Sequence, residues 1–146
     1  MCIRDRPYQV PVSDYSLSLR SFTSNSGEVL SIGEKPRLAL SNPAASMRMA
    51  LAEALTNMAG VVIKGLNNVQ VSANWMAASG ENEEDLALRE GVEALSKISI
   101  NLEVSIPVGK DSLSMKTKWS DDGNELQVTS PLSGVCLLYT SDAADE

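Results

Sequence analysis

The chain has 146 residues, with 12 Lys and Arg, 19 Asp and Glu and no histidine, which gives a formal net charge of −7. This length allows one domain at most, and an acidic chain without a basic run argues against nucleic acid as the main partner. No apolar run has the length of a membrane span and no signal peptide is evident. We therefore expect no membrane partner and a cytoplasmic location.

Both ends of the chain resemble a translated sequencing adapter. Met1–Arg6 reads back into codons like the end of a transposon adapter, and the first part of Cys136–Glu146 reads back as its reverse complement. We interpret residues 1–6 and 136–146 as artefacts and leave them out of the fold prediction. Residues 7–135 are then expected to be a fragment of a longer protein, cut at both ends.

This interpretation narrows the possible chemistry of residues 7–135. The segment has 10 Lys and Arg against 15 Asp and Glu, a net charge of −5. Both cysteines, Cys2 and Cys136, lie in the excluded ends. The segment alone therefore supplies no disulfide, no Cys/His zinc site, and no catalytic triad or Cys–His pair.

The first half of the chain predicts one long helix. Residues 29–40 have room for one or two short strands around Gly33 and Pro36. A helix is expected to begin at Asn42-Pro43, where a capping residue precedes a proline at the first helical position, and to end at Gly60. Its core stripe is predicted to be Met47, Leu51, Ala54, Leu55 and Met58.

The second half mixes strands with a second helix. Residues 68–75 alternate as a strand, with Val69, Val71, Ala73 and Trp75 on one face. Residues 80–98 are expected to form a helix with an acidic first turn and a buried stripe of Leu88, Val92 and Leu95. Strands are predicted at 100–106 and 113–119, and a turn at 121–124 makes 126–128 a hairpin partner. Together these elements predict an α+β fold, a mixed β-sheet packed by two helices.

A polar motif follows the strand predicted at 100–106. Within Ile106–Thr117, Pro107 and Gly109 suggest a turn, and Lys110 and Asp111 stand beside it. Such a pair either binds a ligand or braces a polar turn. The residues alone leave both interpretations open.

A second candidate site lies on the first helix. Glu53 and Asn57 are four residues apart and share a helical face with the small residues Ser46 and Ala50. A carboxylate and an amide oxygen on such a face can hold a hard cation such as Mg²⁺. The alternative is a solvated helix face. Asp14 is a third carboxylate, which by itself reads as a turn residue.

Several strings of this sequence together resemble phosphoribosylformylglycinamidine synthase in its long, single-chain form. They are Gln9–Asp14, Ile32–Lys35, Glu53–Asn57, Leu66–Ala78 and Ile106–Thr117, in matching order. The resemblance implies the N-terminal domain of the second of two halves that are each related to aminoimidazole ribotide synthetase, truncated here.

The resemblance also implies a site and a function. It maps magnesium ligands onto Asp14, Glu53 and Asn57, and an ATP or ADP contact onto Ser13, through its backbone. Lys110 and Asp111 are further candidates for nucleotide binding. A fourth acidic ligand is expected beyond Val135. The implied parent is an ATP-dependent ligase that makes formylglycinamidine ribonucleotide from formylglycinamide ribonucleotide and glutamine.

The partners implied are small-molecule substrates and the remaining domains of the same chain. The fragment alone is expected to be inactive. Two alternatives stay open. The segment is a non-catalytic nucleotide-binding brace, or it belongs to another member of the aminoimidazole ribotide synthetase superfamily.

Overall fold

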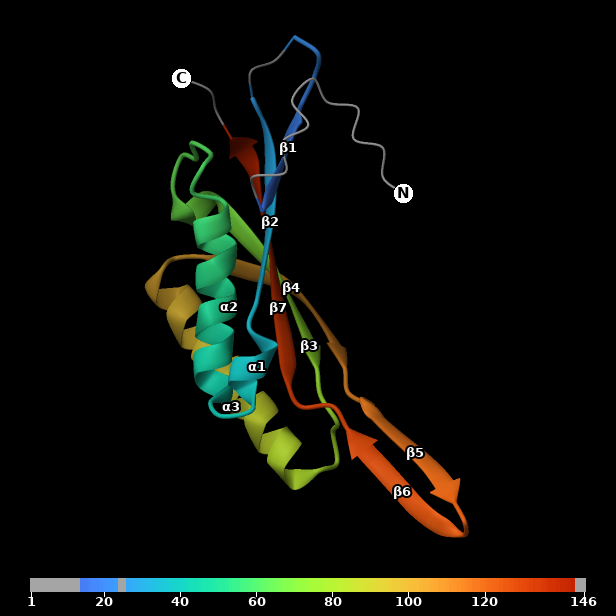
Figure 1. The fold of residues 1–146 in the computed structure, drawn as a ribbon. Coiled ribbons are helices and arrows are strands. Elements are labelled where there is room, and N and C mark those ends of the chain that lie inside the picture. The colour runs from blue at the N-terminus through green and yellow to red at the C-terminus, as the bar shows by residue number, and fades with distance from the viewer. Residues whose placement is uncertain (1–13, 24–25, 144–146) are drawn as a thin grey trace.

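A five-stranded mixed sheet forms the centre of the fold, and two helices cover one of its faces (Figure 1). The computed structural model describes residues 14–23 and 26–143. The strand order is β1-β2-β7-β3-β4, with β3 and β4 parallel and the other neighbours antiparallel. The sheet strands are β1 (Tyr15–Leu19), β2 (Gly27–Glu34), β3 (Val69–Met76), β4 (Ser105–Ser112) and β7 (Ser133–Ala143). The predicted α+β class is confirmed.

The remaining elements are helices on the covered face and a hairpin beside the sheet. The helices are α1 (Pro36–Ala39), α2 (Pro43–Asn57), α3 (Asn82–Asn101) and the short 3₁₀ turn η1 (Leu66–Asn68). The hairpin strands β5 (Lys116–Asp121) and β6 (Asn124–Thr129) pair with each other and project as a separate ribbon (Figure 1). Within the described ranges, no helix is long and apolar enough to cross a membrane.

Helix α2 follows its prediction closely. Asn42 Oδ1 accepts a hydrogen bond from Ala45 N at 2.8 Å, and Pro43 occupies the first turn. The helix ends at Asn57, three residues before Gly60. Of the predicted core stripe, four side chains are buried and Leu55 is half-buried. The buried ones are Met47, Leu51, Ala54 and Met58.

Helix α3 packs through a different stripe from the one predicted. Leu95 is buried as expected and Leu88 is half-buried, but Val92 is 42% exposed. A Cβ on Gly91 would lie 3.1 Å from both Leu132 and Met47. The helix therefore approaches its neighbours through Gly91, and this turns Val92 toward solvent. The small residues Gly91, Ala94 and Ser99 form the rest of the buried surface.

The strand predicted at residues 100–106 is partly wrong. Helix α3 continues to Asn101, and Glu103 then adopts a positive φ of 56° while Val104 N donates to Ser99 O at 2.9 Å. This turn ends the helix without a glycine, so no stop signal is visible in the sequence. Strand β4 begins only at Ser105.

The turn predicted at Gly109 is also wrong. Strand β4 runs through Pro107, Gly109, Lys110 and Asp111 to Ser112, and pairs in parallel with β3. It lies at the edge of the sheet, where a proline without an N–H is tolerated. The residues that suggested a turn therefore lie within an edge strand.

The hairpin prediction is confirmed. The two residues of the turn, Asp122 and Gly123, have φ values of 47° and 83°, as a tight two-residue hairpin turn requires. The region 29–40 contains one strand, β2, followed by the short helix α1, rather than a second strand.

Strand β7 lies in the middle of the sheet, between β2 and β3. It includes residues 136–143, and its buried side chains Cys136, Leu138 and Thr140 pack under the helices. Omitting this segment from the fold prediction therefore missed the central strand. Its origin from an adapter stays a prediction.

Candidate functional site

The candidate site lies where helix α2 contacts the end of strand β2. Contact between the two backbones is so close that a Cβ on Gly33 would lie 2.0 Å from Ala50 O and 2.4 Å from Ala54 N. Ser46 Oγ adds a hydrogen bond of 2.7 Å to Lys35 O. We call this region, residues 32–35 with Ser46, Ala50, Glu53 and Asn57, the α2–β2 junction.

The small residues on this helical face do not open it to a cation. Ser46 and Ala50 are both fully buried against the chain from β2 to α1. Small residues here allow close packing of the backbones rather than access for a cation. Any ligand must therefore approach Glu53 from the partly exposed end of the face.

Glu53 is held by two donors from the chain that follows Gly33. Glu34 N donates to Glu53 Oε2 at 2.9 Å, and Lys35 Nζ forms an ion pair with Oε1. The hydrogen bond from Lys35, followed by the one from the Glu34 backbone, lowers the pKa of the Glu53 carboxyl below its usual value. The Glu53 side chain is 28% exposed, and its carboxyl is charged at neutral pH.

Asn57 is oriented by the same strand. Its Nδ2 donates to Ile32 O at 2.9 Å, so its Oδ1 is the atom that can accept or ligate. Glu53 and Asn57 therefore present oxygen donors one helical turn apart, beside residues 32–34.

Asp14 directly precedes β1, whose first residue, Tyr15, pairs with Ser31 of β2. Asp14 is exposed, and the β1–β2 ladder begins one residue after it. Ser13 lies outside the described residues.

Glu53 and Asn57 carry the donor types that a hard cation takes, since carboxylate and amide oxygens are the donors that Mg²⁺ prefers. In this structure, however, an ammonium already neutralises Glu53. No cluster of three or more His, Cys, Asp or Glu occurs in the described part of the chain, so Asn57 or a donor from elsewhere must complete the set.

Lys110 and Asp111 do not form a joint site. They are neighbours in an extended strand, so their side chains point to opposite faces of the sheet. Lys110 pairs across the ladder with Asn74, and its Nζ donates to Ser112 Oγ at 3.1 Å. Both residues are exposed. The structure does not bring them together on one ligand.

The sequence interpretation overlooked Lys35. It belongs to the string Ile32–Lys35 but was assigned no role. A basic residue two positions after a buried glycine carries no local signal of its contact with Glu53, which is 18 residues away. Only the close packing of α2 on β2 brings the two charges together.

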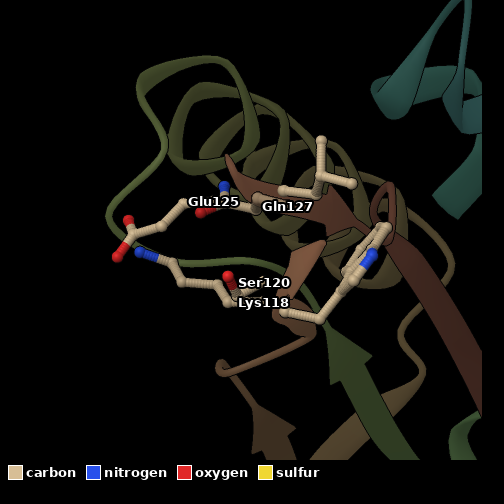
Figure 2. A pocket seen from close by; sticks show the side chains of 6 residues that line it. Lys118, Ser120, Glu125 and Gln127 are labelled. Atoms are coloured by element: carbon tan, nitrogen blue, oxygen red, sulfur yellow. The ribbon is translucent and has the colours of Figure 1, made fainter. Parts of the chain in front are cut away.

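A hollow of about 430 Å³ lies on the β5–β6 hairpin, away from the junction. Lys118 and Glu125 point toward one another on its polar face (Figure 2). Gln127 Nε2 donates to Glu81 Oε1 at 3.0 Å and so ties the ribbon to the start of α3. None of the predicted site residues that the structure describes lines this hollow, which is a surface feature of the ribbon.

Several solved structures of Thermotoga maritima PurL share this fold. Thermotoga maritima PurL in complex with ADP matches with a TM-score of 0.62 at 16% identity, over 89% of this chain and 20% of that one. The same protein in complex with FGAR gives a TM-score of 0.63 at 16% identity, over 87% of this chain and 19% of that one. At this identity the likeness shows the fold, that of the PurM-like N-terminal domain in PurL.

The sequence agrees with this fold class. The sequence model of the FGAR-AT PurM_N-like domain family matches residues 2–141 of the chain. The chain belongs to the FGAR-AT PurM_N-like domain family. It spans about a fifth of the length of the solved proteins that it resembles.

Proposed function

We propose that this chain is part of a phosphoribosylformylglycinamidine synthase. The complete enzyme converts formylglycinamide ribonucleotide, glutamine and ATP to formylglycinamidine ribonucleotide, ADP, phosphate and glutamate. The observation that carries this proposal is the family match over residues 2–141. It is supported by the shared fold with a PurL protein that has been solved with ADP and with FGAR.

Within that enzyme, we assign the α2–β2 junction to an auxiliary nucleotide site. Glu53, Asn57 and Asp14 would supply oxygen donors to Mg²⁺, and Ser13 would contact the nucleotide. When bound, Mg²⁺ neutralises phosphate charge. The close backbone contact at Gly33, the hydrogen bond that Glu34 N donates to Glu53 and the one that Asn57 donates to Ile32 O hold both side chains in place for this role.

Lys110 and Asp111 remain separate candidates for nucleotide binding. Because their side chains point to opposite faces of β4, only one of them can contact a nucleotide bound at one face. Lys110 is the better candidate for a phosphate, because it carries a positive charge on a flexible stem.

The uncovered face of the sheet is a candidate contact for the remaining domains of the same chain. Leu30 and Ile32 are 44% and 49% exposed on the face opposite α2. They pair across the ladder with Tyr139 and Leu137. An apolar sheet face of this kind is normally packed against another element. The proposal also implies small-molecule substrates, a cytoplasmic location, and no nucleic acid or membrane partner.

A turnover assay tests the assignment as a ligase. The full-length protein is expected to form the amidine from formylglycinamide ribonucleotide, glutamine and ATP, whereas the 146-residue chain alone is expected to form none. Amidine formation by the isolated segment would contradict the view that this domain is only a part of the catalytic unit.

The auxiliary site favours a structural role over a catalytic one, because Glu53 also ties two elements of the core together. Glu53→Ala in the full-length enzyme is expected to lower the melting temperature and the amount of nucleotide that copurifies, with little change in kcat. Glu125→Ala, an exposed carboxylate on the hairpin, is the matched control. A large fall in kcat with unchanged folding and nucleotide content would overturn the structural role.

A further inference from the structure

Glu53 already holds a cation in this structure, the ammonium of Lys35. Backbone groups hold both residues of this ion pair in place. Lys35 O accepts the hydroxyl of Ser46 at 2.7 Å, and the preceding residue, Glu34, donates its N–H to Glu53 at 2.9 Å. The stem of Lys35 is the flexible part of this arrangement, and its side chain is 40% exposed.

A divalent cation at Glu53 has to compete with this ammonium. Both species need the same carboxylate, and two positive charges within a few ångströms repel each other strongly when they are partly shielded from water. Bare Mg²⁺ must therefore displace Lys35 or bind beside it at a disadvantage. A nucleotide changes this balance, because its phosphate oxygens offer the displaced ammonium a new partner.

We propose that Lys35 acts as an exchangeable counter-ion that makes cation and nucleotide binding at the α2–β2 junction cooperative. Without ligand, Lys35 neutralises Glu53 and keeps it against Glu34 N. When Mg²⁺ and nucleotide bind together, Lys35 would release Glu53 to the cation, and its ammonium would pair with a phosphate of the nucleotide instead. This inference rests on the proposed function, since it takes Glu53 as a cation ligand.

Cooperativity of this kind is reciprocal. If ADP raises the affinity for the cation, the cation raises the affinity for ADP by the same factor. A neutral side chain at position 35 removes both parts of the coupling. The cation alone then binds more tightly, because nothing competes for Glu53, and the nucleotide binds less tightly, because one phosphate partner is lost.

The experiment titrates the full-length protein with Mn²⁺, a spectroscopic substitute for Mg²⁺, and follows free Mn²⁺ by electron paramagnetic resonance with and without ADP. Lys35→Met is expected to bind Mn²⁺ about tenfold more tightly without ADP and to lose about tenfold of the enhancement by ADP. Lys97→Met, an exposed lysine on α3 whose Nζ lies 3.9 Å from Glu93, is the control and should match the wild type.

Two further variants separate the possible failures. Glu53→Gln is expected to remove one Mn²⁺ site per chain, and retention of all sites would contradict the proposed auxiliary site.

A second outcome tests Lys35 alone. If Glu53→Gln removes the site but Lys35→Met keeps the wild-type affinity and coupling, the counter-ion role is wrong and the auxiliary site is still supported. Lys35→Gln can still donate a hydrogen bond to Glu53 and serves as the second variant if Lys35→Met does not fold. It should lose the same coupling between Mn²⁺ and ADP. Wild-type coupling in a folded Lys35→Gln protein would also overturn the counter-ion role.

Discussion

The α2–β2 junction and strand β4 both carry charged residues beside a glycine, but they use them differently. At the junction, Gly33 lets two backbones touch, and the charges of Lys35 and Glu53 pair across the contact. In β4, Gly109 sits in an edge strand, and Lys110 and Asp111 point to opposite faces. Charged side chains therefore meet where two elements pack closely together, and they point apart where they are neighbours in one extended strand.

The two glycines give the largest expected difference. Gly33→Ala should destabilise the fold by about 3 kcal/mol or more, because the new Cβ meets rigid backbone atoms of α2 at 2.0 and 2.4 Å. Gly109→Ala brings its Cβ only to 3.3 Å from Ala73 O and should cost about 1 kcal/mol or less. Urea unfolding of the two variants makes the comparison, and equal losses would contradict the close contact at Gly33.

Acid should weaken the α2–β2 junction. The pKa of Glu53 is lowered from 4.5 in the folded chain, first by Lys35 and then by Glu34 N. Its stabilising effect is therefore fully present above its unfolded pKa and is lost as the pH falls through the lower folded value. Between pH 5 and pH 3 the free energy of unfolding of the wild type is expected to fall more than that of Glu53→Gln. The extra loss should be about 1 kcal/mol, as for other hydrogen-bonded groups of this kind.

The matched control for this titration is Glu125→Gln, which changes an exposed carboxylate on the hairpin. Its stability should follow the wild type across the same pH range. Parallel curves for all three proteins would show that the Lys35–Glu53 contact is absent in solution.

The smallest effect is expected in β4 itself. Lys110→Ala removes an exposed side chain whose Nζ contacts Ser112 Oγ, so stability should change by less than about 0.5 kcal/mol. Copurifying nucleotide, measured by absorbance after denaturation, should fall less than in Glu53→Ala. A greater loss in Lys110→Ala would move the nucleotide contact from the junction to β4.

Sequence patterns predicted the elements that carry local signals. Asn42 and Pro43 mark the start of α2, the acidic residues 83–85 mark the first turn of α3, and Asp122-Gly123 marks the hairpin turn. The patterns failed where a signal was absent or ambiguous. Glu103 ends α3 without a glycine, and Pro107 and Gly109 lie within a strand because β3 pairs along one side of them.

The candidate site divides in the same way. The spacing of Glu53 and Asn57 placed them on one helical face, and the string 32–35 was recognised without a role for Lys35. The partners of those side chains depend on contacts between residues 18 and 25 positions apart, which no local pattern encodes.

By itself, the sequence determined the fold class, the start of α2, the hairpin turn and the family, because capping residues, periodicity and motif strings are local. Only the tertiary structure decided that Ser46 and Ala50 are buried, that Lys110 and Asp111 face apart, and that Lys35 neutralises Glu53. These outcomes depend on how closely α2 packs on β2 and on which strand pairs beside β4. Both are set by the whole sheet rather than by neighbouring residues.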